Sequence, residues 1–193
     1  MIRFFAILTI LFSSFGHIAH AQINETFSDM NFTANPEWTG DTDKFEVINP
    51  PNSGDGSIDI SWSPDGHLLR SIPDSASAAL TTISDRANGE WLFSIAEGRG
   101  WAVSGSNDYY VIIMSDTNDP NQLKDDTKDF NGYFLRFDGA NSDNFTFNKQ
   151  TGTTTTLLID AGFPEGNDGT TSKTYSVKIT RDTDGNWELF IDE

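Results

Sequence analysis

The sequence from Thr174 to Asp192, TYSVKITR-DTDG-NWELFID, decides the fold of this chain. Every second residue of each arm is apolar: Tyr175, Val177 and Ile179 in the first arm, and Trp187, Leu189 and Ile191 in the second. Side chains of a strand alternate between its two faces, so this pattern places one face on a core and the other in water. Asp184-Gly185 supplies the residues that a tight hairpin turn requires. The stretch predicts an antiparallel β-hairpin.

Short strand-like segments separated by turn signals fill the rest of the chain. The expected strands are an edge strand within Gln22–Asn35, then Phe45–Ile48, Ile58–Trp62, His67–Ile72, Ala79–Ile83, Glu90–Ala96, Asp108–Ser115, a strand from Asn131 with Tyr133, Leu135 and Phe137 on one face, Phe145–Phe147 and Thr154–Asp160. Asp108–Ser115 is apolar on both faces, which is typical of a strand covered on both sides. Asp116–Asp129 is an acidic loop. The pattern predicts one all-β domain over residues 22–193, an antiparallel sandwich or barrel.

The first residues have the pattern of a secretory signal. Arg3 gives a positive start, Phe4–Phe15 is an apolar run, and Ala19 and Ala21 are small residues where a signal peptidase cleaves. The apolar run is too short to span a bilayer. We therefore expect residues 1–21 to be removed before Gln22, and the protein to be secreted or held at the outer cell surface without membrane insertion.

Composition excludes several classes of partner. Twelve basic residues against 29 acidic ones leave a formal charge of −17, which repels nucleic acid and anionic lipid. The chain has no cysteine, so it is not one of the small disulfide-linked extracellular modules. A domain of this length can be held by its apolar core alone.

Three tryptophans lie where exposure to solvent is expected. Trp38, Trp62 and Trp101 fall in predicted loops or at strand ends, whereas Trp91 and Trp187 belong to the apolar faces of strands and are expected in the core. An aromatic ring offers an apolar face to the C–H side of a sugar. Trp38, Trp62 and Trp101 are therefore the candidate glycan contacts, although packing also accounts for each of them.

Acidic clusters offer oxygen ligands for calcium. Asp41 with Asp43, and Asp182 with Asp184, place carboxylates two residues apart, and further aspartates stand in the loop Asp116–Asp129. None of these clusters completes the loop pattern of an EF-hand. Turn chemistry alone also explains Asp182 and Asp184. No cofactor is required, and calcium is the one candidate ion.

The sequence lacks the usual catalytic constellations. A β-sandwich glucanase carries its carboxylates in a Glu-x-Asp-x-x-Glu strand, and the nearest approach here is Glu188 and Asp192, which have a different spacing. His67 is the single histidine after the signal, and no serine stands in an elbow motif. The chain is predicted not to be an enzyme.

Several segments together resemble the concanavalin A-like, or laminin-G-like, jelly-roll domain of secreted and surface proteins of Bacteroidetes. They are Phe27–Asp29, Pro36–Asp41, Phe45–Val47, Glu90–Phe93, Val111–Asp116, Asn131–Arg136 and Thr180–Phe190. The resemblance implies two facing antiparallel sheets, with ligands of the lectin relatives on a concave face or at rim loops. The family pattern continues past Glu193 with further strands, so the domain is expected to be incomplete here. These motifs specify fold more than activity.

Three functions from different classes follow. The leading hypothesis is a non-catalytic exported module that binds a polysaccharide or cell-surface glycan, or mediates adhesion. The alternatives are a structural spacer of a larger surface protein and a glycoside hydrolase or lyase relative. A pair of carboxylates in a groove would favour the enzyme, and a surface without exposed aromatic side chains would favour the spacer.

Overall fold

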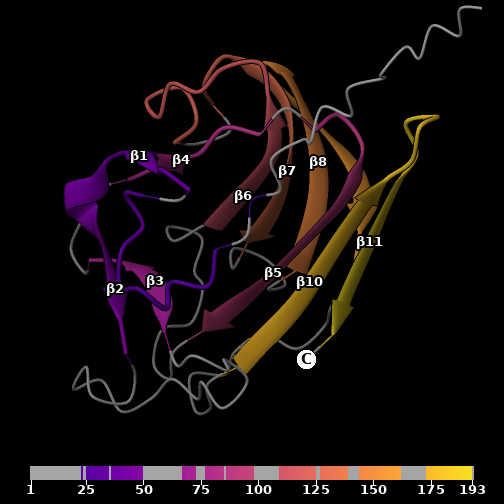
Figure 1. Cartoon of the computed structure of the whole chain (residues 1–193). Coiled ribbons are helices and arrows are strands. Elements are labelled where there is room, and N and C mark those ends of the chain that lie inside the picture. Colours follow the sequence, from indigo (N-terminus) through magenta and orange to yellow (C-terminus); the bar gives the residue numbers. More distant parts are fainter. Residues whose placement is uncertain are drawn as a thin grey trace, which may run out of the picture.

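The computed structural model describes residues 23, 25–34, 36–49, 67–72, 77–84, 86–97, 109–124, 127–138, 144–161 and 173–192. In these ranges the chain is all-β and contains no α-helix (Figure 1). The elements are β1 Thr39–Gly40, the 3₁₀ turn η1 Thr42–Lys44, β2 Phe45–Ile48, β3 Leu68–Ser71, β4 Leu80–Thr81, β5 Gly89–Glu97, β6 Tyr109–Ser115, β7 Phe130–Asp138, β8 Asn144–Gly152, β9 Thr154–Asp160, β10 Lys173–Arg181 and β11 Trp187–Asp192. The predicted signal and the predicted strand Ile58–Trp62 lie outside the described residues.

The hairpin predicted from period-two patterning is confirmed as β10 and β11. Val177 is opposite Ile191 and Ile179 is opposite Leu189, so the apolar residues of both arms share one face. On its other side β10 pairs antiparallel with β5, also predicted from its alternation. The result is a three-stranded sheet in the order β11-β10-β5 (Figure 1).

The connection between β10 and β11 is a tight turn, as predicted. The Gly185 N–H donates to the Asp182 carbonyl at 3.2 Å, and the Asp182 N–H donates to the Asn186 carbonyl at 3.1 Å. Arg181 pairs with Trp187, which leaves residues 182–186 as the loop. The Oδ1 atom of Asp182 accepts the backbone N–H of Asp184 at 2.9 Å and that of Asn186 at 2.8 Å, and these bonds stabilise the turn. Gly185 has a φ of 89°, whereas Asp184 is not among the residues with positive φ. The predicted turn and its glycine are confirmed, and Gly185 is the one residue of this turn with a positive φ.

The second sheet is four-stranded and antiparallel, in the order β6-β7-β8-β9. Its strand β8 extends to Gly152, well beyond the predicted segment Phe145–Phe147. The polar residue Gln150 is fully buried here because its amide is fully used. Its Nε2 donates to the carbonyls of Lys128 and Gly152, and its Oε1 accepts from Thr155 Oγ1 at 2.6 Å. A buried strand of polar residues gives no hydrophobic signal, which explains the short prediction.

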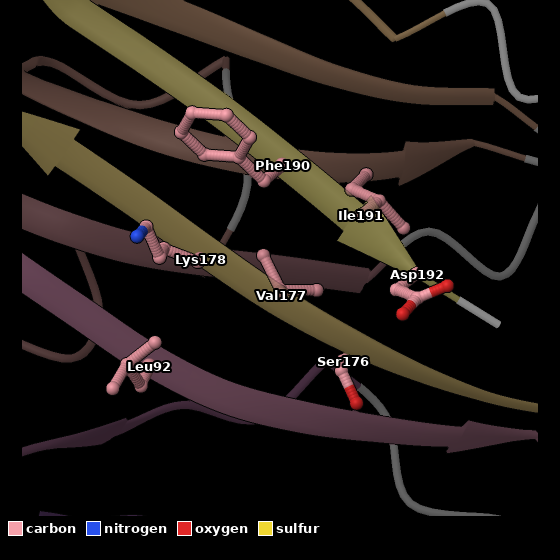
Figure 2. Close-up of a pocket in the computed structure, with 7 residues that line it drawn as sticks. All are labelled: Leu92, Ser176, Val177, Lys178, Phe190, Ile191 and Asp192. Atoms are coloured by element: carbon pink, nitrogen blue, oxygen red, sulfur yellow. The ribbon is translucent and has the colours of Figure 1, made fainter.

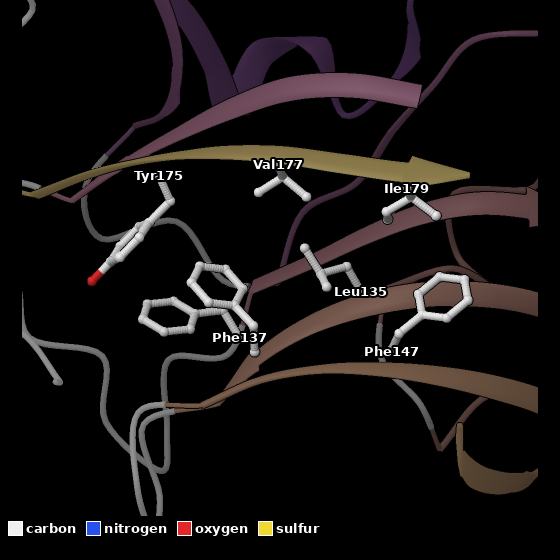
Figure 3. Close-up of a cluster of buried hydrophobic side chains, with 7 residues drawn as sticks. Leu135, Phe137, Phe147, Tyr175, Val177 and Ile179 are labelled. Carbon is white, nitrogen blue, oxygen red and sulfur yellow. The ribbon is translucent and has the colours of Figure 1, made fainter. Parts of the chain in front are cut away.

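The main core lies between these two sheets (Figure 3). Seven of its side chains are at most 2% exposed: Tyr175, Val177 and Ile179 from β10, Leu135 and Phe137 from β7, and Phe145 and Phe147 from β8. The rings of Phe137 and Phe145 stack with centroids 4.3 Å apart, and Tyr175 meets Phe145 edge-on. The two antiparallel sheets therefore pack face to face, as in a β-sandwich.

Trp91 and Trp187 pack at this core, as predicted. Trp187 has its ring centroid 5.6 Å from that of Trp91, 4.8 Å from that of Tyr133 and 4.9 Å from that of Phe147. The guanidinium of Arg181 lies over the Trp187 ring at 5.3 Å. Both tryptophans therefore serve the fold.

The acidic loop that follows β6 covers the outer face of β6 and β7 in the four-stranded sheet. Leu123 from this loop packs in a second cluster with Phe130 and Phe134, against Tyr110 and Ile112. Val111 and Ile113 face the main core. The prediction that Asp108–Ser115 is covered on both sides is confirmed for β6.

The N-terminal part departs most from the prediction. Residues 25–34 form turns in place of the edge strand predicted within Gln22–Asn35. Asp29 accepts the backbone N–H of Asn31, and the Asn31 side chain accepts that of Thr33, both at 2.9 Å. Such local bonds compete with strand pairing. Beyond this segment β1 pairs with β4 and β2 pairs with β3, and β4 is limited to Leu80–Thr81.

Candidate functional site

The outer face of the β5-β10-β11 sheet is the candidate site. Strand pairing arranges its outward side chains in three cross-strand rows: Glu90–Thr180–Glu188, Leu92–Lys178–Phe190 and Ser94–Ser176–Asp192. These are the alternate residues to those of the core, so they point away from it. Among the described residues, no segment packs over this face as the acidic loop does on the other sheet.

The central row contains two large exposed apolar side chains. Leu92 is 66% exposed and Phe190 is 50% exposed. They border an open depression of about 210 Å³, whose lining also includes Ser176, Lys178 and Asp192 (Figure 2). The surface thus combines an accessible aromatic ring with a hydroxyl, an ammonium and a carboxylate.

Lys178 is held between two partners on this face. Its Nζ lies 3.2 Å from Glu90 Oε2 and 5.2 Å from the centroid of the Phe190 ring. The ammonium therefore links β5 to β11 across β10 and covers part of the ring. In the next row the Thr180 hydroxyl donates to Glu188 Oε2 at 3.3 Å.

Asp192 differs from Glu90 and Glu188, the other two carboxylates of the face, in its contacts. It lines the depression directly opposite Ser176 (Figure 2). The structure gives its carboxylate no hydrogen bond or ion pair with another described residue. With Glu90, Glu188 and Asp192 against Lys178, the face carries more negative than positive charge.

The outer face also bears on the alternative of glycoside hydrolysis. Glu188 and Asp192, the carboxylates nearest to a glucanase pattern, do share the outer face of β11. Four residues of extended strand separate their Cα atoms by about 13 Å. Retaining glycosidases hold their carboxyl groups about 5 Å apart and inverting ones at most about 9.5 Å apart.

Trp38, the one predicted tryptophan contact that the structure describes, lies just before β1 and outside the β5-β10-β11 sheet. The Trp38 backbone N–H donates to the carbonyl of Phe32 at 3.0 Å just before β1. Its indole Nε1 is buried and has no acceptor among the described residues, so the polar edge of the ring points inward. Trp62 and Trp101 lie outside the described residues. Phe190 was not predicted as a ligand contact, because its place in the alternating pattern puts it on the solvent-facing side of the strand. A large apolar residue at a solvent-facing position was the signal that could have identified it.

Asp41, the first predicted calcium ligand, is engaged in ion pairs. Its Oδ2 accepts the backbone N–H of Ala79 at 3.1 Å and lies 3.0 Å from Lys124 Nζ. Lys124 and the Ala79 N–H hold the pKa of this carboxyl below its usual value. The contact ties β1 to the acidic loop. Asp43 is exposed in η1.

Asp182, in the second predicted calcium cluster, organises the β10–β11 loop. Its Oδ2 accepts the Asn186 side-chain N–H at 2.8 Å, and the bonds from Asn186 lower the pKa of the Asp182 carboxyl. Asp184 is exposed in the same loop. In the described part of the chain, no group of three or more His, Asp or Glu residues is placed to hold a metal ion. Calcium at Asp41, Asp43, Asp182 and Asp184 stays a prediction.

In the same residues, no helix is long and apolar enough to cross a membrane. Comparisons with protein-family models, with curated proteins and with solved structures found no match. The resemblance to concanavalin A-like domains therefore stays a prediction from the sequence.

Proposed function

We propose that the chain is a non-catalytic glycan-binding module of the concanavalin A-like jelly-roll type, exported to the cell surface. Its binding surface is the outer face of the β5-β10-β11 sheet. The observation that carries this proposal is the half-exposed ring of Phe190 in an open depression bordered by polar side chains. Sugar sites combine an aromatic platform with a few polar groups that fix orientation.

The position of Phe190 supports a binding role over a packing role. The side chain of Phe147 in β8 is fully buried in the core, whereas that of Phe190 is half exposed on the outer face of its sheet. Contiguous exposed apolar side chains on a soluble domain mark interaction surfaces more often than isolated ones do. Leu92 and Phe190 stand in one cross-strand row, with the side chain of Lys178 between them.

Each polar group of the depression has a place in sugar recognition. Ser176 both donates and accepts hydrogen bonds, and Asp192 accepts them from sugar hydroxyls. Lys178 orients the aromatic platform through its cation–π contact with the Phe190 ring. The ligand on this account is a polysaccharide or a cell-surface glycan, and no catalytic step is required.

The test is a binding screen with a matched pair of variants. The full chain and its Phe190→Ala and Ile83→Ala variants are screened against a panel of immobilised polysaccharides. Ile83 is 78% exposed away from this sheet, so its substitution controls for lost surface hydrophobicity. We expect a polysaccharide that binds wild type and Ile83→Ala but not Phe190→Ala. A folded chain that binds none of the panel contradicts the proposal and favours the spacer function.

A further inference from the structure

We infer that the glycan bound at this face carries amino groups, and that Asp192 selects for them. The inference rests on the proposed function and names the chemical class of its ligand. It follows from the net negative charge of the face, and from the fact that two of its three carboxylates have partners in the sheet whereas Asp192 has none among the described residues.

Two of the three carboxylates already have partners in the sheet. Glu90 pairs with Lys178 at 3.2 Å, and Glu188 accepts from Thr180 at 3.3 Å. Asp192 has no such partner in the described part of the chain, and it lines the depression itself. Its carboxylate is the acceptor that an incoming cationic group meets.

Asp192 is also placed beside the aromatic platform. It lies two residues from Phe190 on the same face of β11, which separates their Cα atoms by about 7 Å. Figure 2 shows the Asp192 carboxylate and the Ser176 hydroxyl at the same end of the depression. A sugar residue stacked on Phe190 therefore has both groups within reach of its substituents or of those of the next residue.

Lys178 does not reverse this preference. Its ammonium is engaged by Glu90 and by the ring of Phe190, so it offers little to an anionic sugar. The formal charge of −17 on the whole chain also repels uronic acids and sulfated glycans. Neutral sugars are neither attracted nor repelled by these charges. Charge complementarity thus ranks amino sugars first, neutral sugars second and acidic sugars last.

The test compares oligosaccharides that differ only in charge. The full chain is titrated with β-1,4-linked glucosamine oligomers, with β-1,4-linked glucose oligomers of equal length, and with oligogalacturonate. Because an exposed ion pair is modest, we expect the amino oligomer to bind roughly two- to fivefold more tightly than the neutral one at low salt. The preference should shrink as salt is raised, since exposed charges are screened.

Two variants assign the preference to one residue. Asp192→Asn should bind amino and neutral oligomers with equal affinity, because the substitution removes the charge that distinguishes them. Asp43→Asn removes an exposed aspartate from η1 and should keep the full preference.

The outcomes separate this inference from the proposed function. Equal affinity of wild type for amino and neutral oligomers, or a preference that survives in Asp192→Asn, overturns the inference and leaves the glycan site standing. If the chain does not bind the amino oligomer but binds another polysaccharide through Phe190, the inference is also overturned and the glycan site stands. A folded chain that binds no oligomer and no polysaccharide of the panel overturns both.

Discussion

Lys178 lies directly opposite Phe190 in the β10–β11 pairing, with its ammonium 5.2 Å from the centroid of the phenyl ring. The same ammonium pairs with Glu90 on the other side of β10. One side chain therefore spans three strands on the face that we propose as the binding surface. Exposed cation–π and ion-pair contacts of this kind each contribute up to about 1 kcal/mol, so the row is ordered without being rigid.

Replacing Lys178 should weaken the sheet slightly. Lys178→Met keeps an unbranched side chain but removes the charge that Glu90 and Phe190 share. We expect a loss of about 0.5–1 kcal/mol in the free energy of unfolding, measured by urea denaturation at low salt. Lys149→Met on β8, where Lys149 is exposed, should change it by less than about 0.5 kcal/mol. Equal effects of the two substitutions would show that the Lys178 contacts contribute nothing.

Two phenylalanines from opposite faces should differ sharply in their effect on stability. Phe147 is fully buried, so Phe147→Ala should cost about 3–5 kcal/mol of unfolding free energy. Phe190 is half exposed, so Phe190→Ala should cost about 1 kcal/mol or less. Chemical denaturation of both variants measures the difference. A cost for Phe190→Ala close to that of Phe147→Ala would mean that the face is covered in the folded protein.

Asp41 should make the stability of the protein depend on acid pH. Its carboxyl pKa is lowered in the folded state by Lys124 and the Ala79 N–H. The stabilisation is therefore present above about pH 4, the pKa of an unfolded aspartate, and is lost as the pH falls through the folded pKa. We expect Asp41→Asn to cost about 1 kcal/mol at pH 7 and less at pH 3. Parallel curves of unfolding free energy against pH for the two proteins would contradict this role.

The loop between β10 and β11 should require glycine at position 185. Gly185 has a φ of 89°, a conformation that costs a residue with a Cβ atom about 1–2 kcal/mol. Gly185→Ala should lower the midpoint of thermal unfolding, and Gly185→Asn should lower it less, because asparagine tolerates positive φ better. The reverse order of the two midpoints would show that the loop adopts another conformation.

Strands with a clear apolar pattern, alternating in β5, β10 and β11 or on both faces in β6, could be predicted from the sequence. Alternation in β5, β10 and β11 located these strands and their buried faces, because each pairs an apolar face with a polar one. The extension of β8 was missed because Gln150 is buried through hydrogen bonds and not through apolarity. The turn at residues 25–34 was missed because side-chain bonds of Asp29 and Asn31 override a weak strand pattern.

The candidate site was harder to predict than the fold. The sequence predicts sugar contacts at tryptophans in loops and at strand ends, whereas Phe190 lies within a strand. Whether a residue of the wet face is available to a ligand depends on what packs over the whole sheet. That is a tertiary property: the acidic loop covers the outer face of β6 and β7, whereas the outer face of β10 and β11 has no such cover in the described residues.

The most direct test of the central claim is calorimetric titration of wild type and Phe190→Ala with the polysaccharide selected in the screen. The account predicts measurable binding by wild type and an affinity at least about tenfold lower for Phe190→Ala, which is about 1.4 kcal/mol. The two proteins should retain similar cooperative unfolding transitions. Equal affinities would contradict the claim that the outer face of the β5-β10-β11 sheet is the binding surface.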